Sequence, residues 1–213
     1  APGAKPRTLF FRENGGLAFD APTTAASDTY VSDPAKPVPY TLEHTAGYPR
    51  GYPTHDQRFA ASRPDVLVYE TEPLEEDLTF AGPLQATLHV STSGTDSDWV
   101  VKLVDVYDLD FPDPNPNPAH IRMGGYQQLV RGDVMRARFR NSFEKPEPFE
   151  PGKPTKIEMN IPDVCHNFRR GHRIMIHVQS SWFPLVDRNP QTFVPNIAYA
   201  KREDFKKTTQ HVS

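Results

Sequence analysis

Hydrophobic and polar residues alternate along much of this chain with a period of two, which is typical of a β-strand with one buried and one solvated face. The segment 84–91 shows the pattern most regularly, because every even position is apolar and every odd position is polar. Several other segments alternate in the same way, and each is predicted to be a strand. The strands predicted from this pattern span residues 8–11, 65–71, 84–91, 134–140, 155–161 and 173–180.

The segment 99–107 departs from this alternation because both of its faces are apolar. Trp99, Val101 and Leu103 would share one face, and three valines occupy the other face, where Lys102 is the polar exception. A strand with two apolar faces needs cover on both sides. We therefore expect a central strand that lies between a partner sheet and either a long loop or another domain.

Helical patterning is nearly absent, and the one candidate is a short, peripheral helix at 201–208 with acidic residues in its first turn. Two proline-rich segments, 33–57 and 108–119, are predicted to be long loops. Loops of this length inside a compact domain usually have a function or are disordered. The first loop has the side chains of a recognition surface, namely Tyr40, His44, Tyr48, Arg50, Tyr52 and His55.

Composition agrees with an all-β chain. The 23 prolines and 12 glycines among 213 residues divide the sequence into short segments. A chain of this length can bury a sizeable core without a metal or a disulfide, and one domain is the simpler organisation. The net charge of -3, with acids and bases interspersed, argues against nucleic acid as a partner.

Neither a membrane-spanning run nor the apolar region of a signal peptide is visible in the sequence. We therefore expect a chain that does not enter a membrane. A fragment from the interior of a precursor would have lost its signal, so the compartment is left open and export stays compatible with the sequence.

The usual signatures of enzymes are missing. No serine sits in a G-x-S-x-G elbow, and the chain has no H-E-x-x-H, C-x-x-C, G-x-G-x-x-G or Walker motif. The eight histidines lack the spacing of metal ligands. His89 and His177 lie on predicted strands and are interpreted as packed or hydrogen-bonded sheet residues. The sequence thus offers no catalytic residue, metal site or cofactor site.

Three other groups invite chemistry but have simpler explanations. Cys165 and His166 would point to opposite faces of a strand, so Cys165 is interpreted as a small, semi-buried apolar residue rather than a nucleophile. Asp96 and Asp98 could suggest calcium, yet capping of the turn before a strand explains both. The alternating arginines in 134–140 are interpreted as a solvated strand face, with a contact surface for an acidic partner as the alternative; they are Arg136, Arg138 and Arg140.

The segment 171–190, GHRIMIHVQSSWFPLVDRNP, is a specific match to a known family. It resembles the C-terminal domain of the X-Pro dipeptidyl-peptidase, cocaine esterase and α-amino-acid ester hydrolase family. Within it, 183–194 looks most similar to α-amino-acid ester hydrolases and glutaryl cephalosporin acylases. The resemblance continues in order along nearly the whole chain, through 30–39, 65–74, 94–106 and 138–146.

This resemblance implies an all-β jelly-roll sandwich, similar to galactose-binding domains, over residues 1–213. It also implies an upstream α/β-hydrolase domain that bears the Ser-Asp-His triad, so this chain alone should be inactive and needs no cofactor. The parent enzyme would be a serine hydrolase that cleaves esters or amides, or an X-Pro dipeptidyl-peptidase. Family members usually continue past the equivalent of Ser213 into one more strand.

Our leading hypothesis is an accessory domain that packs on the hydrolase domain of the same polypeptide and lends the loop 40–55 to the rim of the substrate pocket. The candidate rim residues are Tyr48, Arg50 and Tyr52. Two alternatives remain. The sandwich could bind carbohydrate, as a jelly roll, through Trp182, Phe183 or Tyr126. It could also form a homo-oligomer interface through the segment 99–107.

Overall fold

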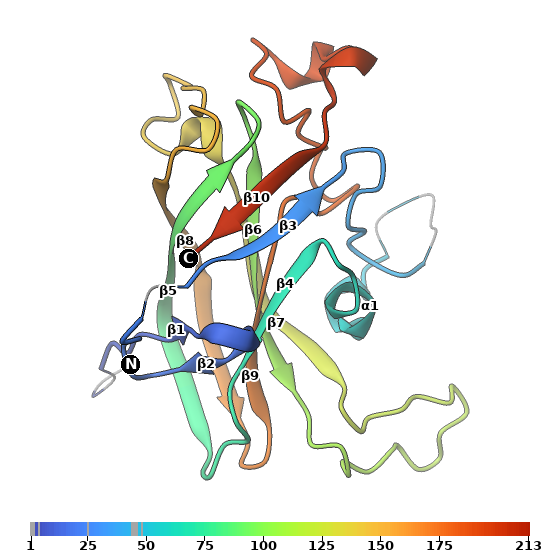
Figure 1. Cartoon of the computed structure of the whole chain (residues 1–213). Coiled ribbons are helices and arrows are strands. Elements are labelled where there is room, and N and C mark those ends of the chain that lie inside the picture. Colours follow the sequence, from blue (N-terminus) through green and yellow to red (C-terminus); the bar gives the residue numbers. More distant parts are fainter. Residues whose placement is uncertain (1–2, 4, 25, 44–46, 48) are drawn as a thin grey trace.

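Two four-stranded antiparallel sheets stack on each other in this computed structural model, which describes residues 3, 5–24, 26–43, 47 and 49–213 (Figure 1). The first sheet has the order β3-β10-β5-β8 and the second β4-β9-β6-β7. The predicted β-sandwich is confirmed, whereas the narrower jelly-roll assignment stays a prediction. The strands are β3 (Asp28–Ser32), β10 (Thr208–Val212), β5 (Leu78–Thr92), β8 (Thr155–Phe168), β4 (Val66–Glu70), β9 (Arg173–Gln179), β6 (Asp98–Val106) and β7 (Gln127–Arg136).

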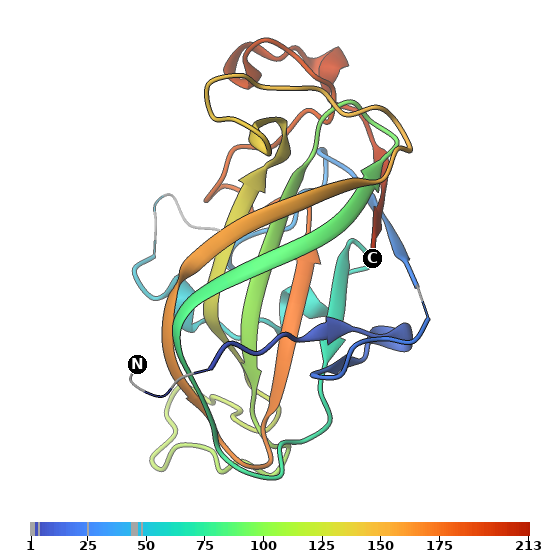
Figure 2. The ribbon, with the colours of Figure 1, turned by 90° about the vertical axis from the view of Figure 1, so that its left-hand side faces the viewer.

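The main core fills the space between the two sheets. Alternation along β5, β8 and β9 turns their apolar side chains toward this space. Figure 2 shows the strands of one sheet crossing in front of those of the other. Trp99 of β6 is fully buried there, and Tyr30 meets its ring edge-on at 6.5 Å. Each large apolar side chain buried in this way contributes about 1.5–3 kcal/mol. The most buried members are Trp99, Ala137, Phe168, Ile174 and Val178.

A hairpin near the N-terminus closes one open side of the sandwich. It consists of β1 (Phe10–Phe11) and β2 (Leu17–Ala18), joined through the 3-10 turn η1 (Glu13–Gly15). Phe11 stacks on Tyr69 of β4 with ring centroids 3.9 Å apart. Gly15 has a φ of +73°, and a Cβ there would lie 2.9 Å from the Val68 carbonyl oxygen, so both its conformation and its closeness to β4 require glycine.

A bulge in the β5–β8 pair changes which side of β8 faces the core. Gly82 pairs with Val164, but Leu84 pairs with Ile161, so the register shifts by one residue. Beyond the bulge His166 points inward, toward Asp105, while Cys165 is exposed. The prediction that these two neighbours point to opposite faces is confirmed. The interpretation of Cys165 as semi-buried was wrong, because the bulge turns its side chain to solvent.

Helix is scarce in the described residues, as predicted. The one α-helix among them is α1 (Arg58–Ala61), and the remaining turns are of the 3-10 type. The helix predicted at 201–208 was wrong: η5 (Arg202–Asp204) makes a single turn, and β10 then begins at Thr208. β10 lies between β3 and β5, where Gln210 and Val212 are buried, so sheet pairing overrides the weak local helix signal. The other 3-10 turns are η2 (Tyr52–Thr54), η3 (Ala137–Phe139) and η4 (Ile197–Tyr199).

The predicted arginine-bearing face was also wrong. β7 ends at Arg136, and η3 turns the following side chains, so Arg138 is only 3% exposed and pairs with Asp96 at 2.7 Å. Arg136 pairs with Asp98 at 2.9 Å. These ion pairs hold a long excursion after β9, because Arg138 Nη1 also donates to the Val194 carbonyl oxygen at 2.8 Å. The arginines therefore anchor a loop rather than cover a solvated strand.

Candidate functional site

The outer face of the second sheet is covered by the chain itself. Val100 of β6 packs there with Tyr40 of the loop 33–57 and with Trp182, which follows β9. Farther along the same face, α1 packs on Val66 of β4 through Ala60. The prediction that β6 is covered on both faces is confirmed, and the cover on the outer side is the long loop (Figure 1).

Backbone hydrogen bonds fix the first part of this loop. The Tyr40 N–H donates to the Phe183 carbonyl oxygen at 2.9 Å, and the Phe183 N–H donates to the Val38 carbonyl oxygen at 3.0 Å. Ser181 adds a further bond, because its hydroxyl accepts from the Val38 N–H at 2.8 Å. The loop is therefore held as a short ladder beside the segment after β9.

The predicted rim residues differ from one another in their exposure, and one of them lies outside the described residues. Tyr52 is half-buried, and its ring lies 5.2 Å from that of Tyr40, so it packs partly toward the sheet. Arg50 is exposed at the surface of the loop. Tyr48 and His44, by contrast, lie outside the described residues. The assignment of the rim to Tyr48, Arg50 and Tyr52 stays a prediction.

A second long loop, between β6 and β7, is braced against the first. Arg58 donates to the carbonyl oxygens of Gly124 and Arg122, both at 3.1 Å, while its Nε donates to Asp56 at 2.6 Å. The Tyr126 hydroxyl also donates to the Thr54 carbonyl oxygen. This brace leaves no signal in the sequence, because its partners lie more than sixty residues apart and share no local pattern.

Large apolar side chains are exposed on the two braced loops, which project from the same side of the sandwich (Figure 1). Leu42 on the first loop is 65% exposed, and Leu109 on the second is 82% exposed. Ile121 adds to them on the second loop. These three side chains are the candidates for a contact surface on the two loops.

A buried polar layer lies beneath the first loop. Lys102 of β6 is fully buried, its Nζ lies 3.2 Å from Gln57 Oε1, and burial lowers its pKa to about 7. Its cross-strand neighbour His177 is also buried, and burial, followed by the charge of Lys102, lowers the pKa of His177 to about 3. The interpretation of His177 as a packed sheet residue is confirmed, whereas His89 is exposed.

The aromatic residues considered for carbohydrate binding do not form an open platform. Trp182 is only 6% exposed, and its indole is packed between Tyr40 and Val100. Phe183 and Tyr126 are half-buried, and the Tyr126 hydroxyl is engaged with the first loop. The segment 99–107, considered for self-association, is the inner strand β6, with its faces covered by its own chain.

A cluster of two histidines and a carboxylate has a structural role. Asp105 Oδ2 lies 2.8 Å from His166 Nε2, and its Oδ1 lies 2.8 Å from His172 Nδ1. Asp105 is on β6, His166 is on β8 of the other sheet, and His172 is in the turn before β9. The carboxylate therefore ties the two sheets together at this end of the sandwich.

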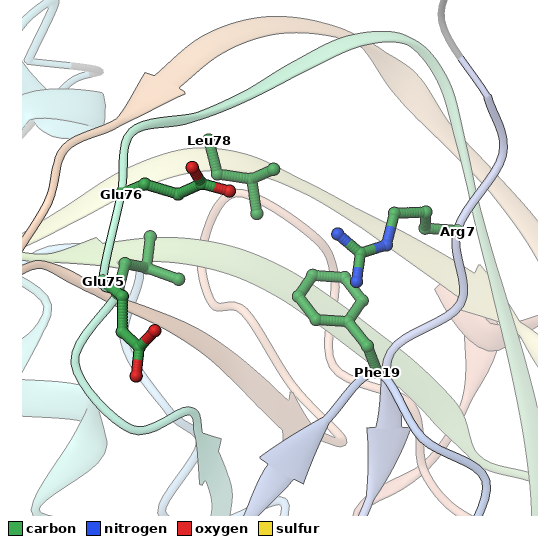
Figure 3. A pocket seen from close by; sticks show the side chains of 6 residues that line it. Arg7, Phe19, Glu75, Glu76 and Leu78 are labelled. Atoms are coloured by element: carbon green, nitrogen blue, oxygen red, sulfur yellow. The ribbon is translucent and has the colours of Figure 1, made fainter.

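A shallow groove of about 480 Å³ lies beside the N-terminal hairpin (Figure 3). The Arg7 guanidinium stands 3.7 Å from the centroid of the Phe19 ring on one side, and Glu75 and Glu76 line the other. The groove is open to solvent and carries charges of both signs. Its lining residues flank the N-terminal hairpin or lie at and before the start of β5, and none belongs to the two braced loops.

In the described part of the chain, no group of three or more His, Cys, Asp or Glu side chains is arranged to hold a metal ion. Nor does any helix in that part have the length and apolar character needed to cross a bilayer.

The ion pairs of Arg136 and Arg138, the Asp105 carboxylate and the Arg58 brace each join separate strands or loops of the sandwich. The chain belongs to the family of X-Pro dipeptidyl-peptidase C-terminal non-catalytic domains, whose model matches residues 1–213. The family resemblance found in the segment 171–190 is thereby confirmed.

Three relatives are particularly informative. An aminopeptidase of known structure from a marine sediment archaeon, Thaumarchaeota archaeon, is 49% identical with a TM-score of 0.88, over 96% of this chain and 34% of its own. An α-amino acid ester hydrolase is 45% identical with a TM-score of 0.87, over 96% and 33%. The cocaine esterase of Rhodococcus sp. (strain MB1 Bresler) is 36% identical over 84% and 28%. The chain thus spans about a third of the length of these hydrolases.

Proposed function

We propose that this chain is the single C-terminal accessory domain of a serine hydrolase that cleaves esters, amides or peptides through an acyl-enzyme. Three kinds of support exist. The family is described as non-catalytic, the relatives are named as an aminopeptidase and two ester hydrolases, and the chain spans about a third of each. The nucleophile, base and orienting acid would all belong to the hydrolase domain of the same polypeptide.

The function proposed for the sandwich itself is to hold one wall of the substrate pocket. The observation that carries this proposal is the described part of the loop 33–57, in which Tyr40 packs on the outer face of β6 beside Trp182 and Arg50 is exposed. A wall held on a rigid sheet can orient a substrate and exclude water without taking part in bond breaking. The exposed Leu42 and Leu109 would meet the hydrolase domain.

Replacing the rim side chains in the full-length enzyme tests this proposal. We expect Tyr52→Ala and Arg50→Ala each to lower kcat/KM about tenfold, which corresponds to about 1.4 kcal/mol of transition-state stabilisation. Tyr48→Ala should act in the same way. A matched control is Phe143→Ala, which removes a side chain that is 83% exposed and lies in another loop. An unchanged kcat/KM in all three rim variants would refute the assignment of the rim.

The expected cause is loss of positioning, so the acylation chemistry should survive. An active-site titration with a fluorophosphonate should label the serine of each rim variant to full stoichiometry. Loss of labelling would mean that the variant has unfolded or that the catalytic domain is disturbed, and the rim assignment would then not account for the lower rate.

A further inference from the structure

Lys102 carries a buried amine with no carboxylate beside it among the described residues. It lies on the outer face of β6 and is 0% exposed, and among the described residues it forms no ion pair. Its Nζ lies 3.2 Å from Gln57 Oε1 and 5.1 Å from the centroid of the Trp182 ring. Gln57 ends the segment 49–57 and Trp182 follows β9, so Lys102 is enclosed while both of these segments lie on the sheet.

A glycine on the neighbouring strand β7 leaves space for the Lys102 side chain. Gly132 of β7 is the cross-strand neighbour of Lys102. A Cβ at position 132 would lie 3.2 Å from Lys102 Cγ and 3.2 Å from Trp182 Cη2. The absence of that carbon lets the lysine stem run along the sheet beneath the indole. Three segments therefore fit around the Lys102 side chain: β7, the loop that ends at Gln57 and the segment after β9.

The surrounding groups do not compensate a charge on Lys102. On β9 its neighbour is His177, which is held neutral by burial, and on β7 it is Gly132. From the loop, Gln57 contributes an amide; the nearby Asp56 is engaged by Arg58, and His55 is bonded to the Thr41 hydroxyl. A protonated Lys102 thus has hydrogen bonding and a π-face for support, but no carboxylate.

The covered layer also contains unpaired polar atoms. His177 Nδ1, Gln179 Oε1 and Trp182 Nε1 are buried and have no hydrogen-bond partner among the described residues. Unpaired buried polar groups destabilise the covered state relative to one in which water reaches them. Local opening of the loop over this layer therefore costs less free energy than opening over an apolar face of the same area.

We propose that Lys102 is a positioning residue that makes the seating of the segment 49–57 depend on protons: this part of the loop seats over uncharged Lys102, and its opening lets water reach the amine, which then takes up a proton. The effect of this device on catalysis rests on the proposed function, because the same loop is the proposed pocket wall. The linkage between protonation of Lys102 and seating of the loop needs only the sheet, the loop and Lys102.

The direction of the effect follows from the two environments of the amine. Burial lowers the pKa of Lys102 from 10.5 to about 7 in the seated state, and contact with water restores the ordinary value in the open state. Between these values the open state binds more protons, so raising the pH favours the seated state. The ratio of seated to open loop should rise by up to about tenfold per pH unit above pH 7. Below pH 7 this group adds no further dependence.

Hydrogen–deuterium exchange in the full-length enzyme tests the proposal directly. Peptides that cover residues 49–63 are followed from pH 6 to pH 9, with rates corrected for intrinsic exchange. We expect their protection to be level below pH 7 and to rise about tenfold or more by pH 9. Lys102→Met, which keeps a side chain of similar length without the charge, should remove the rise. Lys156→Met, at a lysine exposed on β8, should keep it.

A second variant protects the test against a misfolded Lys102→Met protein. Gln57→Glu puts a carboxylate beside Nζ, which keeps Lys102 charged in the seated state, so the rise above pH 7 should vanish although the lysine remains. Protection that is flat from pH 7 to pH 9 in the wild type, or a rise that persists in both variants, would overturn the proposal. Exchange reports the loop itself, so failed rim substitutions would refute the pocket wall and leave this result standing.

Discussion

At the scale of single residues, the outer face of the second sheet departs from ordinary core chemistry. Lys102 and His177 are cross-strand neighbours, and both are buried without a counter-ion among the described residues. Burial disfavours the charged form of each side chain, so the folded state holds fewer protons here than the unfolded chain does. These two residues therefore make the stability of the sandwich depend on pH.

His177 should weaken the fold in acid. Its pKa falls from 6.5 to about 3 on folding, so the unfolded chain takes up a proton in this window and the folded chain does not. The contribution of His177 to the free energy of unfolding is therefore fully present above pH 6.5. It falls by up to about 1.4 kcal/mol per pH unit as the pH drops toward 3. Urea unfolding measures this effect. Between pH 6.5 and pH 4.5, the free energy of unfolding of His177→Leu should fall by about 2 kcal/mol less than that of the wild type.

The comparison between the two proteins isolates this residue, because carboxylates that titrate in the same range contribute equally to both. His89→Leu, which makes the same substitution at an exposed histidine of β5, is the matched control. Equal losses in the wild type and in His177→Leu would show that His177 does not carry the effect.

At the scale of elements, two ion pairs join the end of the sandwich to the excursion that follows β9. Arg138 and Asp96 are 3% and 0% exposed, and Arg138 also lies 4.6 Å from the Phe193 ring. Arg136 pairs with Asp98 and donates to the Asp187 carbonyl oxygen at 2.8 Å. The loop after β9 is thus attached to the sheet through charges that are themselves withdrawn from water.

Removing one partner of the inner pair should be costly. Arg138→Met leaves the Asp96 carboxylate buried without its cation, and we expect a loss of about 3–5 kcal/mol in the free energy of unfolding. Asp96→Leu together with Arg138→Met removes both charges, and much of that loss should return. Denaturant midpoints with unchanged m values measure both effects. A double variant no more stable than Arg138→Met would contradict the interpretation that the unpaired carboxylate causes the loss.

The extent to which the fold can be predicted from the sequence also differs from element to element. Strands β5, β8 and β9 were predictable, because a period of two is a local property of chains with one buried face. The inner strand β6 was predictable from its two apolar faces. β10 was missed, because two of its three buried residues, Thr208 and Gln210, are polar and only the neighbouring strands make them part of a sheet. The ion pairs of Arg136 and Arg138 depend on the turn η3, which alternation cannot reveal.

At the scale of the whole molecule, the sandwich presents two long loops on one side and holds them as one unit. Family membership was predictable from motifs along the chain, but the joining of these loops was not, because it depends on contacts between distant segments. Arg58 supplies that joining through Asp56, Gly124 and Arg122. A pocket wall built from the first loop would therefore be stiffened by the second.

Loosening this brace should free the second loop first. Arg58→Lys keeps a cation beside Asp56 but cannot donate to both carbonyl oxygens at once, because an ammonium lacks the planar fork of a guanidinium. We expect exchange protection in residues 109–124 to fall several-fold in the full-length enzyme. If the loops act as one wall, KM should rise about threefold to tenfold while kcat changes less. Arg170→Lys, at an exposed arginine in the turn after β8, is the matched control. Lower protection with an unchanged KM would show that the second loop does not support the wall, whereas unchanged protection would show that Arg58 does not join the loops.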